Sequence, residues 1–225
     1  MNFIRCLAAI CHKDLLSELR KRETLNSILF FGILIIFLFS FAIGPETALL
    51  KKLAPGLLWL VVLFSAVLAL DRSFQAEAEE GCLDRLILYS VSHRAIFLGK
   101  LFTNFLFVLI VQTVVLLMMM VLYDLDVPKE PWNLVLIFLL GDLGIATLGT
   151  FYALLITKTR ARQVMLPLLL FPMLIPLLLA CVFATQYALE GDPFLQARPW
   201  IEMLFVFDSI FLSACLLTAG LLLEA

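Results

Sequence analysis

Six long apolar stretches occupy most of this chain, and each has about the 20 residues that a helix needs to cross a bilayer. Apolar residues occupy consecutive positions in them, whereas a lipid-facing barrel strand alternates apolar with polar positions. The sequence therefore predicts an all-α, polytopic membrane protein with six transmembrane helices. The predicted spans are Leu25 to Pro45, Leu53 to Leu70, Leu101 to Tyr123, Pro131 to Thr157, Gln163 to Leu189 and Met203 to Leu223.

Composition supports a lipid-facing surface. Of the 225 residues, 63% are hydrophobic and only 15% are charged, whereas roughly 25% of a soluble domain is charged. The net charge of −2 and the scattered basic residues give no basic stripe, so we expect no nucleic-acid partner. His12 and His93 both fall outside the spans, so we expect no directly bound haem, no metal site and no cofactor held by this chain alone.

The basic residues predict the orientation. Six spans put both termini on one side, and twelve of the 16 Lys and Arg residues fall on that side, against four on the other. Because cytoplasmic loops carry the excess of basic residues, both termini and the interval 71–100 are expected in the cytoplasm. Aromatic residues that anchor helices at the outer interface would then be Tyr123, Trp132, Tyr187 and Trp200, with Trp59 a little deeper.

This topology divides the chain into two structural units. Residues 1–24 are predicted to form an amphipathic cytoplasmic helix on the inner membrane surface, with its basic residues facing anionic lipid. A cytoplasmic extension of the first span is the alternative. Residues 25–225 form the six-helix transmembrane domain.

The interval 71–100 is the one long polar stretch between apolar runs. It combines an acidic edge with an apolar stripe, as docking helices do, and Gly81 permits a break between the two. A solvated connector is the alternative. We predict that a soluble partner docks on Glu79, Glu80, Gly81, Leu83, Asp84, Leu86 and Leu88.

No catalytic residue is expected. The chain has no G-x-x-x-x-G-K-[ST] motif, because Arg94 and Leu101 occupy the first Gly and the Ser/Thr positions around Gly99-Lys100. If ATP drives this protein, another chain hydrolyses it.

Asp142 falls within the fourth span, where a central Asp costs about 2.5 to 3.5 kcal/mol on insertion scales. Helical spacing puts it on one face with Ala146, Gly149 and Ala153, and small residues mark close helix approach. We predict that Asp142 faces protein and bonds a neighbouring helix, through Gln112 or a backbone carbonyl. Asp208, about five residues from the outer end of its predicted span, is expected to reach water.

The fifth span contains Pro167, Pro172 and Pro176, each of which removes a backbone donor. These prolines predict a kinked hinge helix that could switch between two packings. Packing in a static bundle is the alternative, because proline is common in membrane helices.

Two rival functions come from other classes. A proton-coupled secondary transporter could relay protons through Asp142 and Asp208, although no internal repeat is evident. An intramembrane aspartyl protease would need two carboxylates that share a proton, with Tyr123-Asp124 and Gly141-Asp142 as weak matches to its paired motifs.

An ordered set of short motifs runs along the whole chain: Gly44-Pro45, Pro55-Gly56 with Trp59, Leu70-Asp71-Arg72 with Phe74, Glu80-Gly81 with Leu83, Leu86 and Leu88, Lys100, and Leu166-Pro167-Leu168 with Pro172 and Pro176. This set resembles the CcmB family, the haem exporter protein B family of cytochrome c maturation. The chain departs from the family pattern at Cys82, at Asp84-Arg85, and in lacking prolines after Ser90 and in the third span.

The resemblance implies an ABC-2-type permease in the bacterial inner membrane, which forms a homodimer and is driven by a cytoplasmic ATPase, CcmA. It implies neighbouring membrane subunits CcmC and CcmD, and release of the haem-loaded chaperone CcmE. The complex as a whole would handle the haem.

Overall fold

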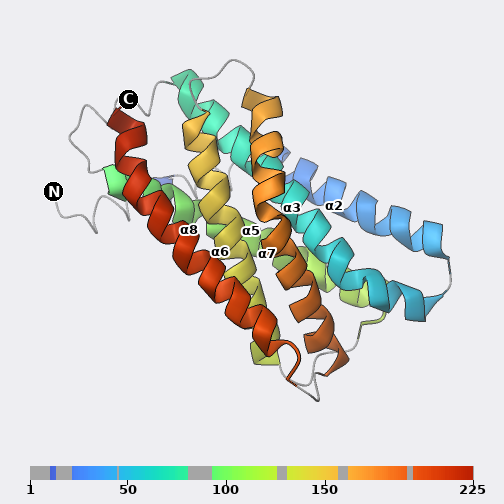
Figure 1. Ribbon diagram of the computed structural model, residues 1–225. Coiled ribbons are helices and arrows are strands. Elements are labelled where there is room, and N and C mark those ends of the chain that lie inside the picture. The colour runs from blue at the N-terminus through green and yellow to red at the C-terminus, as the bar shows by residue number, and fades with distance from the viewer. Residues whose placement is uncertain are drawn as a thin grey trace.

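The protein folds into a bundle of six long helices, seen here in a computed structural model that describes residues 11–13, 22–44, 46–80, 93–125, 131–156, 162–191 and 195–224 (Figure 1). Each helix contains a stretch long and apolar enough to cross a membrane. The prediction of an all-α fold with six spanning helices is confirmed. The helices are α2 (Arg22–Ile43), α3 (Thr47–Glu80), α5 (His93–Leu122), α6 (Pro131–Leu155), α7 (Arg162–Glu190) and α8 (Arg198–Glu224).

Helix α6 is the centre of the bundle. It packs against α3, α5, α7 and α8, and Figure 1 shows it between α7 and α8 with α3 alongside. Helix α2 lies at the edge, where it packs on α3 and α5. Large apolar side chains that are exposed on the surface of the bundle, such as Phe41 on α2 and Leu217 on α8, are suited to contact lipid.

Glycines allow the neighbours of α6 to approach closely. A Cβ atom at Gly149 would collide with the side chain of Leu70 on α3, and one at Gly144 would lie 2.7 Å from a side-chain carbon of Leu177 on α7. Small residues serve this purpose in membrane bundles, because lipid provides no hydrophobic force and close packing must hold the helices together.

Two helices extend beyond their predicted spans. Helix α3 has 34 residues, about 51 Å at 1.5 Å per residue, whereas the hydrocarbon core is about 30 Å thick. Its apolar stretch ends at Asp71, so its last nine residues lie beyond that stretch. Helix α8 begins at Arg198, five residues before the predicted start at Met203, and this changes the depth of Asp208.

The turns at one end of the bundle need left-handed backbone. Gly44, which follows α2, has φ of 75°, and Gly191, which follows α7, has φ of 92°. Glycine adopts this conformation without strain and so ends helices readily.

Tyr123, predicted as an interfacial anchor, is buried instead, and its hydroxyl donates to the Ile36 carbonyl of α2 at 2.8 Å.

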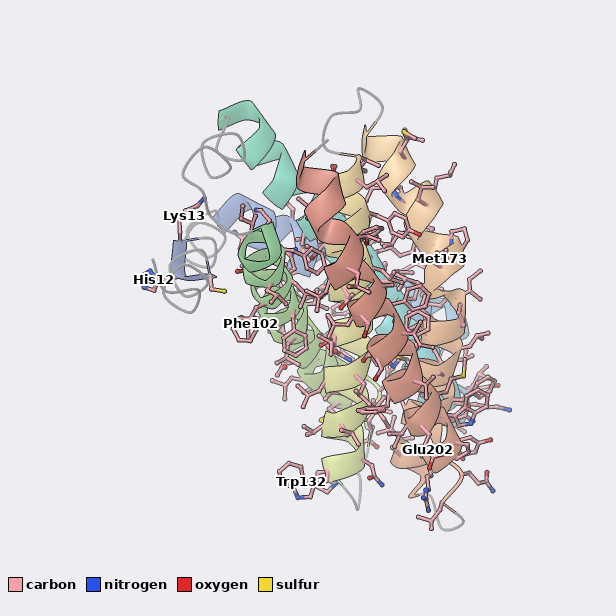
Figure 2. All side chains as sticks on the ribbon, turned by 60° about the vertical axis from the view of Figure 1, so that its left-hand side comes forward. His12, Lys13, Phe102, Trp132, Met173 and Glu202 are labelled. Carbon is pink, nitrogen blue, oxygen red and sulfur yellow. The ribbon has the colours of Figure 1, made fainter. Side chains whose placement is uncertain are left out.

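Of the predicted amphipathic segment 1–24, the structure describes residues 11–13, which are helical, and residues 22–24, which form the start of α2. The Cys11 thiol donates to the carbonyl of Gly99 near the start of α5, at 3.3 Å. His12 and Lys13 lie beside the bundle, away from the end that carries Trp132 (Figure 2). The other residues of this segment, 1–10 and 14–21, fall outside the described residues.

Candidate functional site

A layer of polar side chains crosses the middle of the bundle. It consists of Gln112 on α5, Asp142 on α6, Cys181 on α7 and Asp208 on α8, which we call the polar layer, and all four side chains are buried. Four different helices thus contribute a polar group to a region that the membrane would surround with hydrocarbon. Such groups are costly there and mark functional positions or close helix contacts.

Asp142 accepts hydrogen bonds from a side chain of α5. With its amide nitrogen turned toward α6, Gln112 donates to both carboxyl oxygens of Asp142, at 2.5 and 2.6 Å, and both side chains are fully buried. Gln112 is one of the two partners that the sequence offered. The contact meets the need of a buried carboxyl for donors, which would otherwise cost about 1 to 3 kcal/mol.

Asp208 does not reach water, so this expectation from the sequence was wrong. Because α8 begins at Arg198, Asp208 lies ten residues into the helix and inside its apolar stretch. Its side chain is 4% exposed, and neither carboxyl oxygen has a hydrogen-bond partner. It faces α6, where a Cβ atom at Gly144 would lie 2.7 Å from its Oδ1.

Cys181 joins the two carboxyls. Its thiol lies close enough to Asp142 and to Asp208 for electrostatic interaction with both, and it packs on Gly141, where a Cβ atom would be 2.7 Å from Sγ. The same glycine receives the indole ring of Trp59 from α3. Gly141 therefore lets α3 and α7 meet α6 at the level of the polar layer.

The Trp59 indole links α3 to α7. Its Nε1 donates to Oγ1 of Thr185 at 2.9 Å, in a fully buried contact. The edge of its ring packs against Phe138 of α6, with centroids 5.9 Å apart and an interplanar angle of 81°. Trp59 thus contacts two helices at once, and the movement of α3 is tied to both.

A second hydrogen bond between side chains joins α5 and α6, two helical turns from the contact between Gln112 and Asp142. Nδ2 of Asn104 donates to Oγ1 of Thr150 at 2.9 Å, and both residues are buried. Asn104 lies eight positions before Gln112, and Thr150 lies eight positions after Asp142. Equal spacing in opposite directions is what two antiparallel helices require, so the two bonds fix the register of α5 on α6.

The remaining predicted packing residues of α6 are all buried, namely Ala146, Gly149 and Ala153. Pro167, Pro172 and Pro176 lie within α7, which continues as one helix through all three. The hinge role of these prolines stays a prediction.

The predicted docking residues fall mostly outside the part of the chain that the structure describes. Glu79 and Glu80 are the last two residues of α3, where the backbone is helical. Gly81, Leu83, Asp84, Leu86 and Leu88 lie in the segment 81–92, which is outside the described residues. Docking therefore remains a prediction.

The carboxyls of the two weak protease motifs, Asp124 and Asp142, are not close to each other. Asp124 is exposed just beyond the end of α5, with φ of 49°, whereas Asp142 lies eleven residues into α6, about 16 Å along its axis from the start. These two carboxyls cannot share a proton. Among the described residues, no group of three His, Cys, Asp or Glu side chains is placed to hold a metal ion.

Sequence reasoning missed the packing and hydrogen-bonding roles of Gly141, Gly144 and Asn104, and it missed the burial of Trp59 and Asp208. One signal was present, because Gly141 and Gly144 flank Asp142 and lie three residues apart, which puts them on neighbouring parts of one helix face. The depth of Asp208 had no such signal, since it depends on where α8 begins.

Six apolar helices around a polar layer define a polytopic membrane protein of the α-helical class. The profile of the CcmB protein family matches residues 5–219, nearly the whole length. The chain therefore belongs to the CcmB family.

Individual relatives agree with the family match. The chain is 31% identical to the heme exporter protein B of Pseudomonas aeruginosa over 188 residues, which is 82% of either chain. It is 30% identical to the heme exporter protein B of Rhodobacter capsulatus over 185 residues, covering 82% of this chain and 84% of the relative. A third relative of the same name, from Haemophilus influenzae, is 31% identical over 170 residues, or 76% of either chain.

Proposed function

We propose that this chain is the permease subunit of an ABC transporter that serves haem export in cytochrome c maturation. Family membership and the name shared by its relatives support the haem-related role. The chain itself carries no phosphate-binding G-x-x-x-x-G-K-[ST] motif, so the energy comes from a separate ATPase subunit. The chain is therefore a mechanical component and not an enzyme.

The length of α3 is the observation that carries this proposal. The helix continues from the apolar stretch that ends at Asp71 as far as Glu80. A helical extension of nine residues, about 13 Å at 1.5 Å per residue, takes the acidic end of α3 out of the hydrocarbon. The ATPase would bind this end of α3 together with the apolar residues that follow it, up to Leu88.

Force applied at that end would reach the core through α3. Leu70 of α3 packs on Gly149 of α6, and Trp59 of α3 packs on Gly141 of α6. Trp59 also donates a hydrogen bond to Thr185 of α7. Helix α3 therefore contacts α6 at two points, which lie eleven residues apart on α3 and eight residues apart on α6. A tilt of α3 must move α6, and with it the polar layer.

The charge pattern supports a bacterial inner-membrane location with the docking end in the cytoplasm. Twelve of the 16 basic residues fall on the side of the chain termini, as the positive-inside rule requires of the cytoplasmic side. The opposite end, which carries Trp132 and Glu202 (Figure 2), then faces the periplasm.

The proposed assembly is a homodimer of this chain with a CcmA-like ATPase, CcmC-like and CcmD-like membrane subunits and a CcmE-like haem chaperone. Haem is handled by the assembly, and a partner supplies the iron ligands.

Co-purification tests the proposal. A tagged chain, expressed with the other genes of its assembly, is expected to retain a soluble ATPase subunit after solubilisation in mild detergent. The double substitution Glu79→Lys and Glu80→Lys should abolish retention of the ATPase while membrane insertion is unchanged. Glu202→Lys is the matched control, because it reverses an exposed acidic residue in α8 at the opposite end.

Loss of the ATPase with the Glu202 variant, or full retention with the Glu79/Glu80 variant, would contradict the docking site. Haem release by the purified assembly that continues without nucleotide would contradict ATP-driven function. It would favour the proton-coupled alternative if release then followed an imposed pH gradient.

A further inference from the structure

Asp208 is a buried carboxyl that the packing of the bundle leaves without a partner. Its side chain is 4% exposed, and neither oxygen has a hydrogen bond to any residue that the structure describes. It contrasts with Asp142, in the same layer, whose oxygens both accept from Gln112. Two carboxyls at one depth thus have opposite hydrogen-bonding states.

The absence of a side chain at Gly144 creates the space for Asp208. A Cβ atom at this position would lie 2.7 Å from Oδ1 of Asp208 and 2.7 Å from the Leu177 side chain. One turn further along α6, Thr147 is 1% exposed and its hydroxyl also lacks a partner. The α6 helix therefore presents a second unsatisfied polar group near the carboxyl.

No basic side chain lies at this depth on the described parts of the helices around Asp208. The ionisable groups that share the polar layer with it are the Asp142 carboxyl on α6 and the Cys181 thiol on α7, and both carboxyls interact electrostatically with this thiol. Tyr152 of α6 and Cys215 of α8 interact with each other, and Cys215 is seven residues along α8 from Asp208, about 10 Å.

The described basic groups of these helices are further away. Lys100 of α5 is twelve residues before Gln112, about 18 Å along the helix. Arg198 of α8 is ten residues before Asp208, about 15 Å, and it pairs with Glu202. Neither cation can neutralise the Asp208 carboxyl.

A lone carboxylate in this position would be very costly, because no described side chain or backbone group donates a hydrogen bond to replace its hydration. A metal ion would need several further oxygen ligands, and the described residues supply no such group. A proton needs no additional ligand and no space beyond that beside Gly144. It also removes the charge, so the proton is the ligand that this site can accept.

We propose that Asp208 is an intramembrane proton-binding site, and that binding of the proton is coupled to the packing of α8 on α6. With the proton bound, the neutral carboxyl packs against Gly144 in the arrangement seen here. Release of the proton leaves a charge that must find donors or water, which requires α8 to move away from α6. The site thus responds to pH through a helix contact, whether or not an ATPase drives the chain.

Dicyclohexylcarbodiimide tests this proposal, because this apolar reagent reacts with protonated carboxyls in apolar surroundings. The purified full-length chain in phosphatidylcholine vesicles is treated at several pH values between about 5 and 9, above the ordinary range of an Asp carboxyl, and modified residues are located by peptide mass spectrometry. Asp208 should be modified, and the modification should decline as the pH rises. Asp208→Asn should abolish it, whereas Asp142→Asn should leave it in place.

The Gly144→Ala variant tests the coupling to helix packing. Its added methyl group must displace the carboxyl or α8, so the loss of modification should occur at lower pH than in the unchanged protein. Gly56→Ala is the matched control, because a Cβ atom there meets nothing within 4 Å.

Three results would overturn the proposal. They are no modification of Asp208 at any pH, a modification that does not change with pH, and a folded Gly144→Ala protein with the pH profile of the unchanged chain. The labelling needs no partner subunit, so these results are independent of whether the ATPase in the proposed function is found.

Discussion

The Gln112 amide of α5 donates to the Asp142 carboxyl of α6 at the centre of the bundle, and neither side chain is exposed. The two residues come from antiparallel helices, and a second bond between Asn104 and Thr150 lies two turns away on the same pair. This contact makes a costly residue in the fourth span compatible with the membrane. It also defines the depth at which Cys181 and Asp208 are found.

Replacing Gln112 with Leu should destabilise the protein. It leaves the buried Asp142 carboxyl without a donor, so the free energy of unfolding should fall by about 1 to 3 kcal/mol. Unfolding of the purified chain by a denaturing detergent, followed by circular dichroism, measures this change. The Gln112→Leu/Asp142→Leu double variant should recover part of the loss, and a double variant less stable than the single one would contradict the pairing.

Gly141→Ala should be harmful despite the small size of the substituent. The new methyl group would collide with the Trp59 ring and lie 2.7 Å from the Cys181 sulfur, and such overpacking costs about 1 to 3 kcal/mol. Gly56→Ala is the control, because the space around it is open and alanine favours helix by up to about 1 kcal/mol. Equal thermal stability of the two variants would contradict the close approach at Gly141.

Trp59→Phe should weaken the link between α3 and α7. The substitution keeps an aromatic ring but removes the Nε1 donor to Thr185, and a hydrogen bond of this kind contributes about 0.5 to 1.5 kcal/mol. Thr185→Val should cost a similar amount, and the double variant should cost less than the sum of the two. Strict additivity in detergent unfolding would show that the two side chains do not interact.

Replacing the three prolines of α7 should show whether this helix acts as a hinge or packs statically in the bundle. The Pro167→Ala/Pro172→Ala/Pro176→Ala variant gains backbone donors and should unfold at higher temperature. If α7 is a hinge, the same variant should lower nucleotide-driven turnover of the assembled complex. Pro55→Ala in α3 is the control for proline removal, and undiminished turnover in the triple variant would leave static packing as the role of α7.

The membrane class and the approximate position of every span were predictable from the sequence, because the length of an apolar run is a local property. The same holds for the burial of Asp142, since small residues at helical spacing indicate a close neighbour. Gln112 was one of two candidate partners, and only the register of α5 on α6 selected it.

The depth of Asp208 shows where local reasoning failed. An apolar run beginning at Met203 put this carboxyl near the water, whereas the helix itself starts at Arg198 and includes polar residues in its first turns. The glycine opposite Asp208 belongs to another helix, 64 positions earlier in the chain. No pattern within α8 could reveal it.

By itself, the sequence determined that the chain enters a membrane, how many times it crosses, and which residues are too polar to face lipid. The tertiary structure decided which of those polar residues meet one another and that, among the described residues, the Asp208 carboxyl has no hydrogen-bond partner. The physical reason is that lipid compatibility is set residue by residue along a helix. A hydrogen bond between helices depends instead on their relative register and rotation, which the packing at Gly141, Gly144 and Gly149 fixes.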